Sequence, residues 1–349
     1  MSRFPRPLTA ALAALSAAVL LAGSVGCSSD DAASPSSTTT GIADPITTTT
    51  TSPSTPSTSS ADGSADLPGL WLASPTGISD ESGELWARPR AGETLRSPLD
   101  DGIGGVIYLR CTGTQATCSI EDVPTKGASP TVHGTADSLL AVGTYREQRV
   151  VLTTMTDPSI VPSFEDNRSQ LVAQLIELDA DTVTTIAGWF GWESGPFAAD
   201  VEQNTFVNCS GEGEMCELAT GSDPTQLAPV AGVEPSTVMA LALDPAATRA
   251  TWVEAAPMSG QVSVHALELP NGTTTEFELR PDGSPLADDA VTDGNWVAVR
   301  SGTTVTLTQL ATTGPAATAA GAGTRTVPAG VTEIALRASG GGGGPGLAL

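Results

Sequence analysis

Short strand-like segments fill most of the chain, and they limit its fold more than any other feature. Runs rich in Val, Thr, Leu, Ile and Trp alternate with Gly, Pro, Asp and Asn, as in VIYLRC at 106–111 and RATWVEA at 249–255. Such runs predict β-strands separated by turns. No long stretch repeats apolar residues at the three- and four-residue spacing of an amphipathic helix. We therefore expect an all-β fold, which is a sandwich, a barrel or a propeller.

One segment reads as a complete structural unit. Residues 239–279, MALALDPAATRATWVEAAPMSGQVSVHALELPNGTTTEFEL, alternate four strand-like runs with two turns and a loop. DP at 244–245 opens the first turn, and NG at 271–272 is typical of a two-residue β-hairpin. A single such sheet leaves one face unburied and must stack on another like it. Fainter copies of its parts at 170–188 and 294–314 indicate an internal repeat.

This unit resembles a blade of the TolB-type β-propellers of exported bacterial proteins. In that family a Ser-Pro-Asp-Gly-like turn precedes a strand of the LAFV kind, and a later hairpin carries an Asp-Leu-x-x-Gly turn. Here DPAA at 244–247 precedes the strand at 249–253, and ELPNG at 268–272 stands at the second turn. DPAA lacks the family's Asp-Gly after the proline. The resemblance implies a single β-propeller of four-stranded blades over residues 67–339.

The expected outer hairpins give the number of blades. Their turns are expected near residues 82, 114, 180, 212, 271 and 313. One hairpin per blade predicts six four-stranded blades, with seven as the alternative. The uneven intervals between these turns predict insertions in some blades. We expect the ring to close by pairing a strand from one terminus with the other, because radial closure protects sheet edges.

Four of the five cysteines form two pairs with the same spacing, in CTGTQATC and in CSGEGEMC. They allow three disulfide connectivities. Positions seven residues apart can face each other across a hairpin, where Cα separations of about 4.5–5.5 Å fit a disulfide. In the oxidising space outside the membrane, this favours Cys111–Cys118 and Cys209–Cys216. The redox alternative lacks the Cys-x-x-Cys spacing. The two loops then read as the same outer hairpin on two blades.

The N-terminal residues 1–27 are predicted to be an export signal. Arg3 and Arg6 precede an Ala/Leu-rich apolar run that ends in small residues. The final SVGC resembles a bacterial lipoprotein signal, which implies that Cys27 carries a lipid. Ser24 departs from the family, which usually has Leu there. The alternative is an ordinary secretory peptide. We expect a protein anchored by lipid to the outer face of the cell membrane, stably so with a second acyl chain.

The composition of two further segments is unsuited to a packed core. Residues 28–66 consist mainly of Ser, Thr, Pro, Ala and Asp, which cannot bury enough apolar surface to offset ordering, so we expect a disordered tether. Residues 340–349 begin with a run of glycines and are expected to form a flexible tail.

The chain is strongly acidic, with a formal net charge of −24 and a single lysine, Lys126. Nucleic-acid binding needs clustered positive charge, so we do not expect this protein to bind nucleic acid. The acidity is explained either by solubility outside the cell or by a preference for cations and basic partners.

No catalytic, metal or cofactor site is expected. A Gly-x-Ser-x-Gly elbow is absent, and His133 and His265 lie in unrelated segments. The oxygen-rich loop at 288–295 lacks the alternating Asp pattern and final Glu of a calcium-binding hand, which favours a solvated turn. The Gly/Trp docking motifs of quinone-cofactor dehydrogenases are also absent.

SDESGELW at 79–86 resembles the Asp box of sialidase propellers, a Ser-x-Asp-x-Gly-x-Thr-Trp turn. Glu81 stands where that family has Asp, and Leu85 where it has Thr. The resemblance implies a structural turn that is remote from catalysis. The family's catalytic arginine cluster and Tyr–Glu pair have no assignable counterparts here.

The aromatic cluster GWFGW at 188–192 lies between two expected hairpins. Trp189, Phe190 and Trp192 could form a binding surface that stacks a sugar or a peptide ring. Packing between blades explains the cluster equally simply.

These observations predict a membrane-anchored extracytoplasmic propeller lipoprotein, expected as a monomer. Its expected role is a non-enzymatic binding or scaffold module for a protein, peptide or glycan. The alternative is a carbohydrate-active hydrolase or lyase with its site in the axial funnel of the propeller. Converging carboxylates with Arg or His in a deep pocket would favour the enzyme, and a flat or apolar top face would favour binding.

Overall fold

A computed structural model describes residues 67–348 of the chain. Within that range the residues not described are 114–116, 160, 162–167, 191–193, 211–214, 224–225, 245, 257, 270–271, 273, 312–318 and 338–346. The chain divides into two units, Met1–Ala61 and Asp62–Leu349, and every described residue lies in the second. The expected signal at 1–27 and tether at 28–66 therefore lie outside the described residues. No helix long and apolar enough to cross a membrane occurs in the described part.

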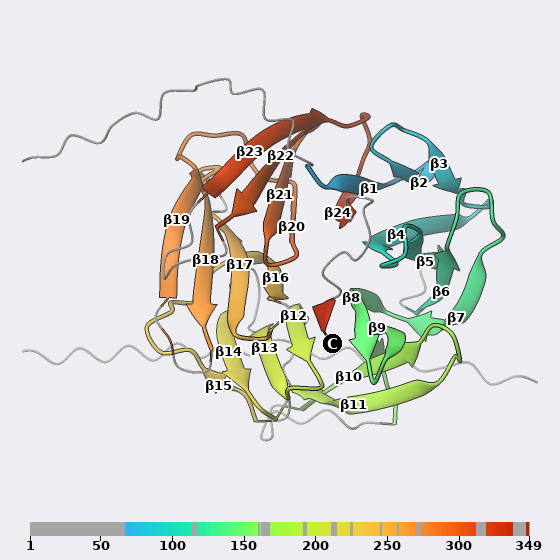
Figure 1. The fold of residues 1–349 in the computed structure, drawn as a ribbon, viewed down its shortest axis with the longest axis horizontal. Helices are drawn as coiled ribbons and strands as arrows, with labels where there is room; N and C mark the ends of the chain where they lie inside the picture. The colour runs from blue at the N-terminus through green and yellow to red at the C-terminus, as the bar shows by residue number, and fades with distance from the viewer. Residues whose placement is uncertain are drawn as a thin grey trace, which may run out of the picture. The chain divides into compact units, whose positions relative to one another are not determined.

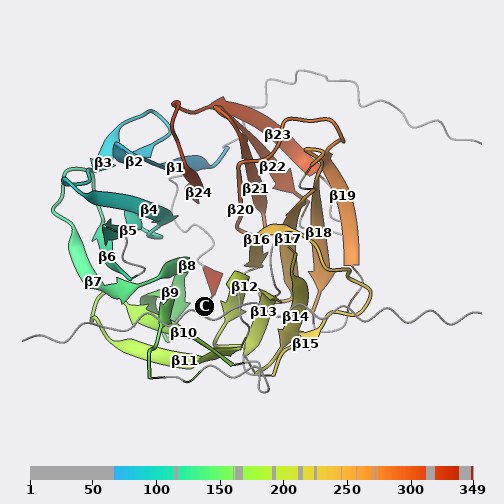
Figure 2. The same ribbon diagram turned by 180° about the vertical axis from the view of Figure 1, so that it is seen from behind.

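The described residues form six antiparallel four-stranded sheets around a central axis, as Figures 1 and 2 show. This confirms the predicted all-β propeller with six blades. From the axis outward, the first three blades consist of β24 (Glu333–Arg337), β1 (Gly69–Ser74), β2 (Gly77–Asp80) and β3 (Leu85–Ala87) in blade 1; β4 (Glu93–Asp100), β5 (Val106–Thr112), β6 (Cys118–Val123) and β7 (Thr131–Ala136) in blade 2; and β8 (Ser138–Tyr145), β9 (Gln148–Thr156), β10 (Arg168–Glu177) and β11 (Val183–Phe190) in blade 3.

The remaining blades follow the same order around the ring. They consist of β12 (Ser194–Asp200), β13 (Thr205–Ser210), β14 (Glu217–Gly221) and β15 (Ala228–Pro229) in blade 4; β16 (Val238–Leu243), β17 (Arg249–Ala255), β18 (Val262–Glu268) and β19 (Thr274–Arg280) in blade 5; and β20 (Asp289–Thr292), β21 (Trp296–Ser301), β22 (Thr304–Leu310) and β23 (Ala319–Thr326) in blade 6. Blade 5 covers the segment 239–279, so that segment is one complete blade, as its sequence predicts.

The ring closes as predicted, because the first and last blade strands of the sequence pair in one sheet. β24 pairs antiparallel with β1, with Leu72 opposite Ile334 and Gly69 opposite Arg337. Blade 1 is therefore built from both ends of the propeller sequence. Within the segment 340–349, expected to be a flexible tail, residues Leu347–Ala348 form a further short strand, β25, which pairs in parallel with β8.

The expected turns are one per blade, but two of them belong to a different hairpin. The turns near 82, 180, 271 and 313 join the third strand of a blade to its outermost strand. Those near 114 and 212 join the second strand to the third. The equivalent outer connections of blades 2 and 4 lie at 124–130 and 222–227, so the outer turns recur at nearly even intervals. The uneven intervals therefore come from assigning two turns to the wrong hairpin. Blade 3 does contain a longer connection, because 157–167 between β9 and β10 exceeds the equivalent connections of the other blades.

Apolar packing between neighbouring blades forms the core. Six clusters of buried residues occur among the described residues, and each joins two adjacent blades around the ring. In β5, Ile107 and Leu109 face blade 3, whereas Val106 and Tyr108 face blade 1. Successive side chains of a strand point to opposite faces of its sheet. A strand buried on both faces is therefore almost continuously apolar, which explains runs such as VIYL.

We expect Leu72→Ala to destabilise the fold strongly. Leu72 is fully buried between blades 6 and 1, and its truncation leaves a cavity that typically costs about 2–5 kcal/mol. The matched control is Leu286→Ala, because that leucine is 54% exposed, and a change of about 0.5 kcal/mol or less is expected there. Urea unfolding measures both. Equal losses in the two variants would contradict the assigned core.

Candidate functional site

A cavity lies on the axis of the propeller. It has a volume of about 530 Å³ and is lined by the innermost strand of every blade: β4, β8, β12, β16, β20 and β24. Volumes of roughly 300–1,000 Å³ are typical of small-ligand pockets. The cavity is therefore large enough to hold a ligand, and it exists because the six inner strands cannot meet at the axis.

The two halves of the cavity wall differ in chemistry. β8, β12 and β16 contribute mainly apolar side chains, among them Leu140, Phe197 and Leu241. Blades 2, 6 and 1 contribute the four carboxylates of the wall, which are Asp100, Asp289, Asp293 and Glu333. No Arg, Lys or His is present among the described residues that line the cavity. The cavity thus has an apolar side and an acidic side, which we call the carboxylate wall.

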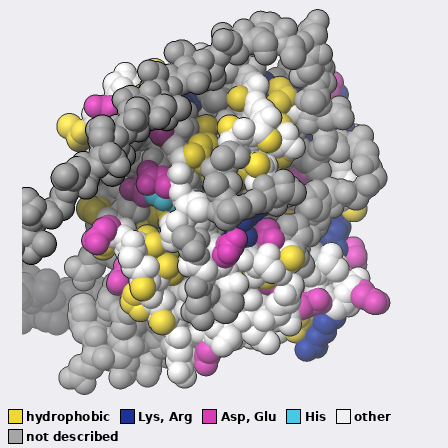
Figure 3. All heavy atoms as spheres, turned by 60° about the vertical axis from the view of Figure 1, so that its left-hand side comes forward, with side chains coloured by type: hydrophobic (Ala, Val, Ile, Leu, Met, Phe, Trp, Pro, Cys, Tyr) yellow, Lys and Arg dark blue, Asp and Glu magenta, His cyan; other side chains and the backbone are white. Residues whose placement is uncertain are grey.

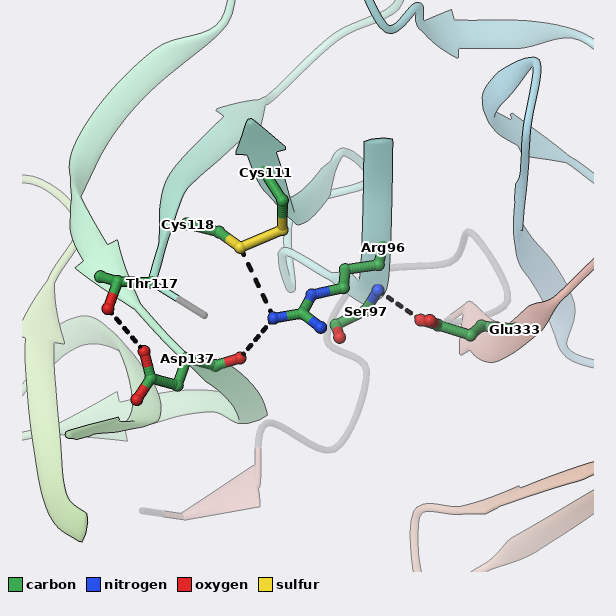
Figure 4. Close-up of a disulfide and its surroundings, with 7 residues drawn as sticks. All are labelled: Arg96, Ser97, Cys111, Thr117, Cys118, Asp137 and Glu333. Atoms are coloured by element: carbon green, nitrogen blue, oxygen red, sulfur yellow. Dashed lines mark hydrogen bonds between the residues drawn. A yellow bond between two sulfur atoms is a disulfide. The ribbon is translucent and has the colours of Figure 1, made fainter. Parts of the chain in front are cut away.

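Two of these carboxylates also join neighbouring inner strands. Asp289 of β20 accepts a hydrogen bond of 2.7 Å from the backbone N–H of Ile334 in β24. Glu333 of β24 in turn accepts one from the backbone N–H of Ser97 in β4, as Figure 4 shows. Ser97 has a positive φ of 52° at an irregularity in the pairing of β4 with β5. The carboxylate wall therefore satisfies backbone donors across blades 6, 1 and 2.

Burial changes the protonation of the carboxylate wall. It raises the pKa of Asp289 from 3.8 to about 6, and the charge of Glu333 adds to that rise. The Ile334 N–H and the Arg300 guanidinium act in the opposite direction. Burial also raises the pKa of Asp293, against the N–H groups of Trp296 and Asn295. The negative charge of the wall therefore falls as the solution becomes mildly acidic.

The segment 288–295 is predicted to be a solvated turn, but it also contributes carboxylates to the cavity wall. Asp293 caps its own turn, with N–H donors from Asn295 at 2.8 Å and Trp296 at 2.7 Å. Asp289 and Asp293 nevertheless line the cavity, so that interpretation is incomplete. What brings them there is the position of β20 as an innermost strand, which the sequence around 288–295 does not indicate.

Both predicted disulfides are present, with Cα separations of 4.5 Å for Cys111–Cys118 and 5.3 Å for Cys209–Cys216. They occupy equivalent hairpins of blades 2 and 4, but these hairpins join the second and third strands and are not the outer ones. In Figure 4 the Arg96 guanidinium points at the Cys118 sulfur, 3.5 Å away. The disulfides therefore stabilise hairpins outside the cavity wall.

The Asp-box-like turn has the structural role that the resemblance implies, with one correction. Asp80 Oδ1 accepts the Glu84 N–H at 3.1 Å, and Oδ2 lies 3.5 Å from the Trp86 indole nitrogen. The carboxylate that holds the turn is thus Asp80 and not Glu81. Glu81 instead accepts the Leu70 N–H at 2.9 Å.

A second ionisable cluster, which the sequence analysis missed, lies between blades 2 and 3. His133 Nδ1 is 2.8 Å from Asp181, and Arg149 is 3.1 Å from Asp122 and 3.4 Å from Asp101. The Asp122 carboxylate, 3.8 Å from Nε2, raises the pKa of His133 most, burial opposes the rise, and Asp181 adds to it. No described residues form a group of three or more metal-ligating side chains. The cluster joins two blades and lies outside the cavity lining.

Two predicted sites cannot be compared with the structure. The backbone of Trp189 and Phe190 ends β11, at the connection from blade 3 to blade 4. Their side chains, Trp192 and the expected lipidation residue Cys27 lie outside the described residues. The aromatic binding surface and the lipid anchor therefore stay predictions.

Comparison with known proteins supports the fold alone. No protein-family model and no curated protein matches the sequence. A chain in the crystal structure of a nidogen/laminin complex aligns with a TM-score of 0.52 and 12% identity, over 78% of this chain and 98% of that one. TolB from Acinetobacter baumannii aligns with a TM-score of 0.50 and 13% identity, over 77% of this chain and 65% of TolB. The chain therefore shares the β-propeller fold with TolB and with a chain of the nidogen/laminin complex, at identities that show the fold alone.

We expect Asp289→Asn to remove a pH dependence of stability. Because the folded-state pKa of about 6 exceeds the ordinary 3.8, protonated Asp289 favours folding. That contribution is complete below about pH 4 and is lost as the pH rises through about 6. Asn keeps an acceptor for the Ile334 N–H but cannot ionise, so the variant should be more stable than wild type at pH 7.5, by up to about 3 kcal/mol, and equal to it at pH 4.

Urea unfolding at the two pH values measures this difference. The exposed Asp282 gives the matched control, since Asp282→Asn should leave the pH profile unchanged. Parallel profiles for wild type and Asp289→Asn would show that burial does not perturb this carboxylate.

Proposed function

We propose that the protein is a membrane-anchored extracytoplasmic binding module whose axial cavity holds a cationic ligand with an apolar body. The observation that carries the proposal is the division of the cavity into an apolar half and a carboxylate wall, with no basic side chain among the lining residues that the structure describes. A peptide segment with Lys or Arg beside apolar residues has the complementary chemistry.

Electrostatics favours such a ligand at long and short range. The net charge of −24 attracts cations from solution. On the face drawn in Figure 3, acidic side chains stand at several separate places among hydrophobic and uncharged ones. Inside the cavity, low-dielectric walls strengthen the attraction between a bound cation and the carboxylate wall. A positively charged ligand is therefore attracted both as it approaches the protein and once it is inside the cavity.

The contacts of the carboxylate wall favour a binding role for the cavity over an enzymatic one. Asp289 and Glu333 each accept a hydrogen bond from a backbone N–H of the next blade. Both carboxylates therefore help to hold neighbouring inner strands together. Arg300 lies opposite Asp289 in the pairing of β20 with β21 and lowers its pKa, but neither it nor any other described Arg or His lines the cavity, where an enzyme would need it. One observation favours the hydrolase alternative: the pKa of about 6 at Asp289, with the charge of Glu333 contributing, suits a general acid.

Anchoring is proposed from the sequence. Residues 1–27 have the charged start, apolar run and terminal cysteine of a lipoprotein signal, and the Ser/Thr/Pro-rich 28–66 would serve as a tether. The nidogen/laminin complex contains a chain of the same fold, which supports protein recognition by analogy of fold alone.

Two capped tripeptides test the cavity. Acetyl-Leu-Lys-Leu-amide should bind about tenfold tighter than acetyl-Leu-Glu-Leu-amide at pH 7.5, which corresponds to about 1.4 kcal/mol. Binding of the lysine peptide should weaken at pH 5 and at high salt, because protonation and screening both reduce the attraction. Isothermal titration calorimetry measures the affinities.

Asp289→Asn should weaken binding of the lysine peptide about three- to tenfold, and the control Asp282→Asn should not. Equal affinity for the lysine and glutamate peptides would refute the cationic preference. Release of reducing ends from oligosaccharides by wild type, lost in Asp289→Asn, would instead establish the hydrolase.

The lipid anchor predicts the behaviour of Cys27→Ser. Wild type should sediment with membranes and incorporate labelled palmitate, whereas Cys27→Ser should do neither, because the serine hydroxyl cannot receive the thioether-linked lipid. Ser28→Ala is the matched neighbour control and should behave as wild type. If Cys27→Ser still sediments with membranes, the anchoring proposal fails.

A further inference from the structure

We propose that the inner edge of β8 is a docking edge for extended peptides, and that the chain's own C-terminal residues Leu347–Ala348 are its intramolecular occupant. The inference rests on the proposed function and narrows its ligand from a cationic molecule with an apolar body to a peptide strand. The tail then acts as a competitor that an incoming peptide must displace.

The tail already forms this contact. Leu347 pairs with Gly143 and Ala348 with Thr144, in a parallel ladder. Figure 1 shows β25 beside β8, within the ring of blades. In the described part of the chain, β8 is the one innermost strand that has a strand partner on its axial side. This edge therefore accepts backbone hydrogen bonds from a segment outside its own blade.

The other long inner edges are interrupted. β4 contains Pro98 beside the left-handed Ser97, and β12 contains Pro196. Proline cannot donate to a ladder and protects sheet edges from added strands. In blades 1 and 2, moreover, carboxylates already occupy inner-edge donors, namely the N–H groups of Ile334 and Ser97.

β8 lacks both kinds of protection among the described residues. Its sequence SLLAVGTY contains no proline, and no described carboxylate accepts from its N–H groups in the way that Asp289 and Glu333 do in blades 1 and 2. After one irregularity near Leu139–Ala141, it pairs regularly with β9 from Ala141 to Tyr145. The corresponding regular run in β16, Ala240–Leu243, is one residue shorter. Gly143 lies within the β8 run, and a glycine in a strand often marks the close approach of another backbone.

The docking edge is continuous with the cavity. Leu139, Leu140, Ala141 and Val142 line the cavity, and the two residues that follow them pair with the tail. A peptide added along β8 would therefore lie against the apolar half of the wall. Its basic side chains could reach across the cavity to the carboxylate wall. Main-chain pairing would supply affinity, and the two halves of the wall would supply specificity, as in other strand-addition sites.

The tail contact is suited to competition. Two paired residues make a small interface, but a tethered segment has a high effective concentration. A ligand that needs the same edge binds only the fraction of molecules whose edge is open, so its apparent affinity falls by that fraction. Removing the tail should therefore strengthen peptide binding without changing the cavity itself.

The test uses the full chain and a chain that ends at Ser339, with fluorescein-labelled Pro-Gly-Leu-Ala-Leu as the probe. This probe has the sequence of residues 345–349. Fluorescence polarisation should show binding about three- to tenfold tighter to the shortened chain. In the full chain, Ala348→Pro removes a backbone N–H from β25 and should bind the probe like the shortened chain. The matched control Ala348→Val keeps that N–H and should bind it like wild type.

The outcomes separate this inference from the proposed function. If acetyl-Leu-Lys-Leu-amide binds but the probe has the same affinity for all four proteins, or none, the docking of the tail is refuted and the cationic cavity stands. If neither peptide binds to any of the proteins, both proposals are refuted. If the probe binds more tightly to the shortened chain and to Ala348→Pro than to wild type and Ala348→Val, the result supports the proposal that the tail occupies the edge of β8.

Discussion

Burial of apolar side chains between neighbouring blades is the interaction on which the rest of the structure depends. Each described cluster joins two adjacent sheets, so no blade has a complete core of its own. Stability then requires a closed ring, because an end blade in an open array would expose one apolar face. The pairing of β24 with β1 provides that closure and makes blade 1 depend on both ends of the propeller sequence. The axial cavity follows from the same closure, since six inner strands surround the axis.

The sequence predicts the fold well because its signals are local. Blade 5 is recognisable from its turns and alternating strands, and the two disulfides follow from a spacing that suits opposite positions of a hairpin. Strands such as β4, ETLRSPLD, and β23, AAGAGTRT, can carry weak local signals, because neighbouring strands impose their extended conformation. The assignment of the hairpins to strand positions failed for a related reason. A turn signal shows that two strands are joined, but not whether they are inner or outer.

The candidate site was largely unpredictable, because ring geometry creates it. Asp289 and Glu333 are 44 positions apart and lie in unremarkable local sequence. They line one cavity because β20 and β24 are the inner strands of adjacent blades. The raised pKa of Asp289 has the same origin, since burial at the axis and the charge of Glu333 both come from the assembled ring. The interblade pair of His133 and Asp181 shows the same limit, as its partners lie on different blades.

Protection of the inner edges connects the stability of the ring to its proposed binding function. Inner strands of a propeller leave backbone N–H and C=O groups along the axis, and such groups are costly unless they are satisfied. Asp289 and Glu333 satisfy two of them and in doing so bring negative charge to one side of the cavity. Across the axis, β8 has neither a capping carboxylate nor a proline, and it pairs with Leu347–Ala348 instead. A peptide with a basic residue could satisfy both features at once, through backbone pairing on β8 and charge on the opposite wall.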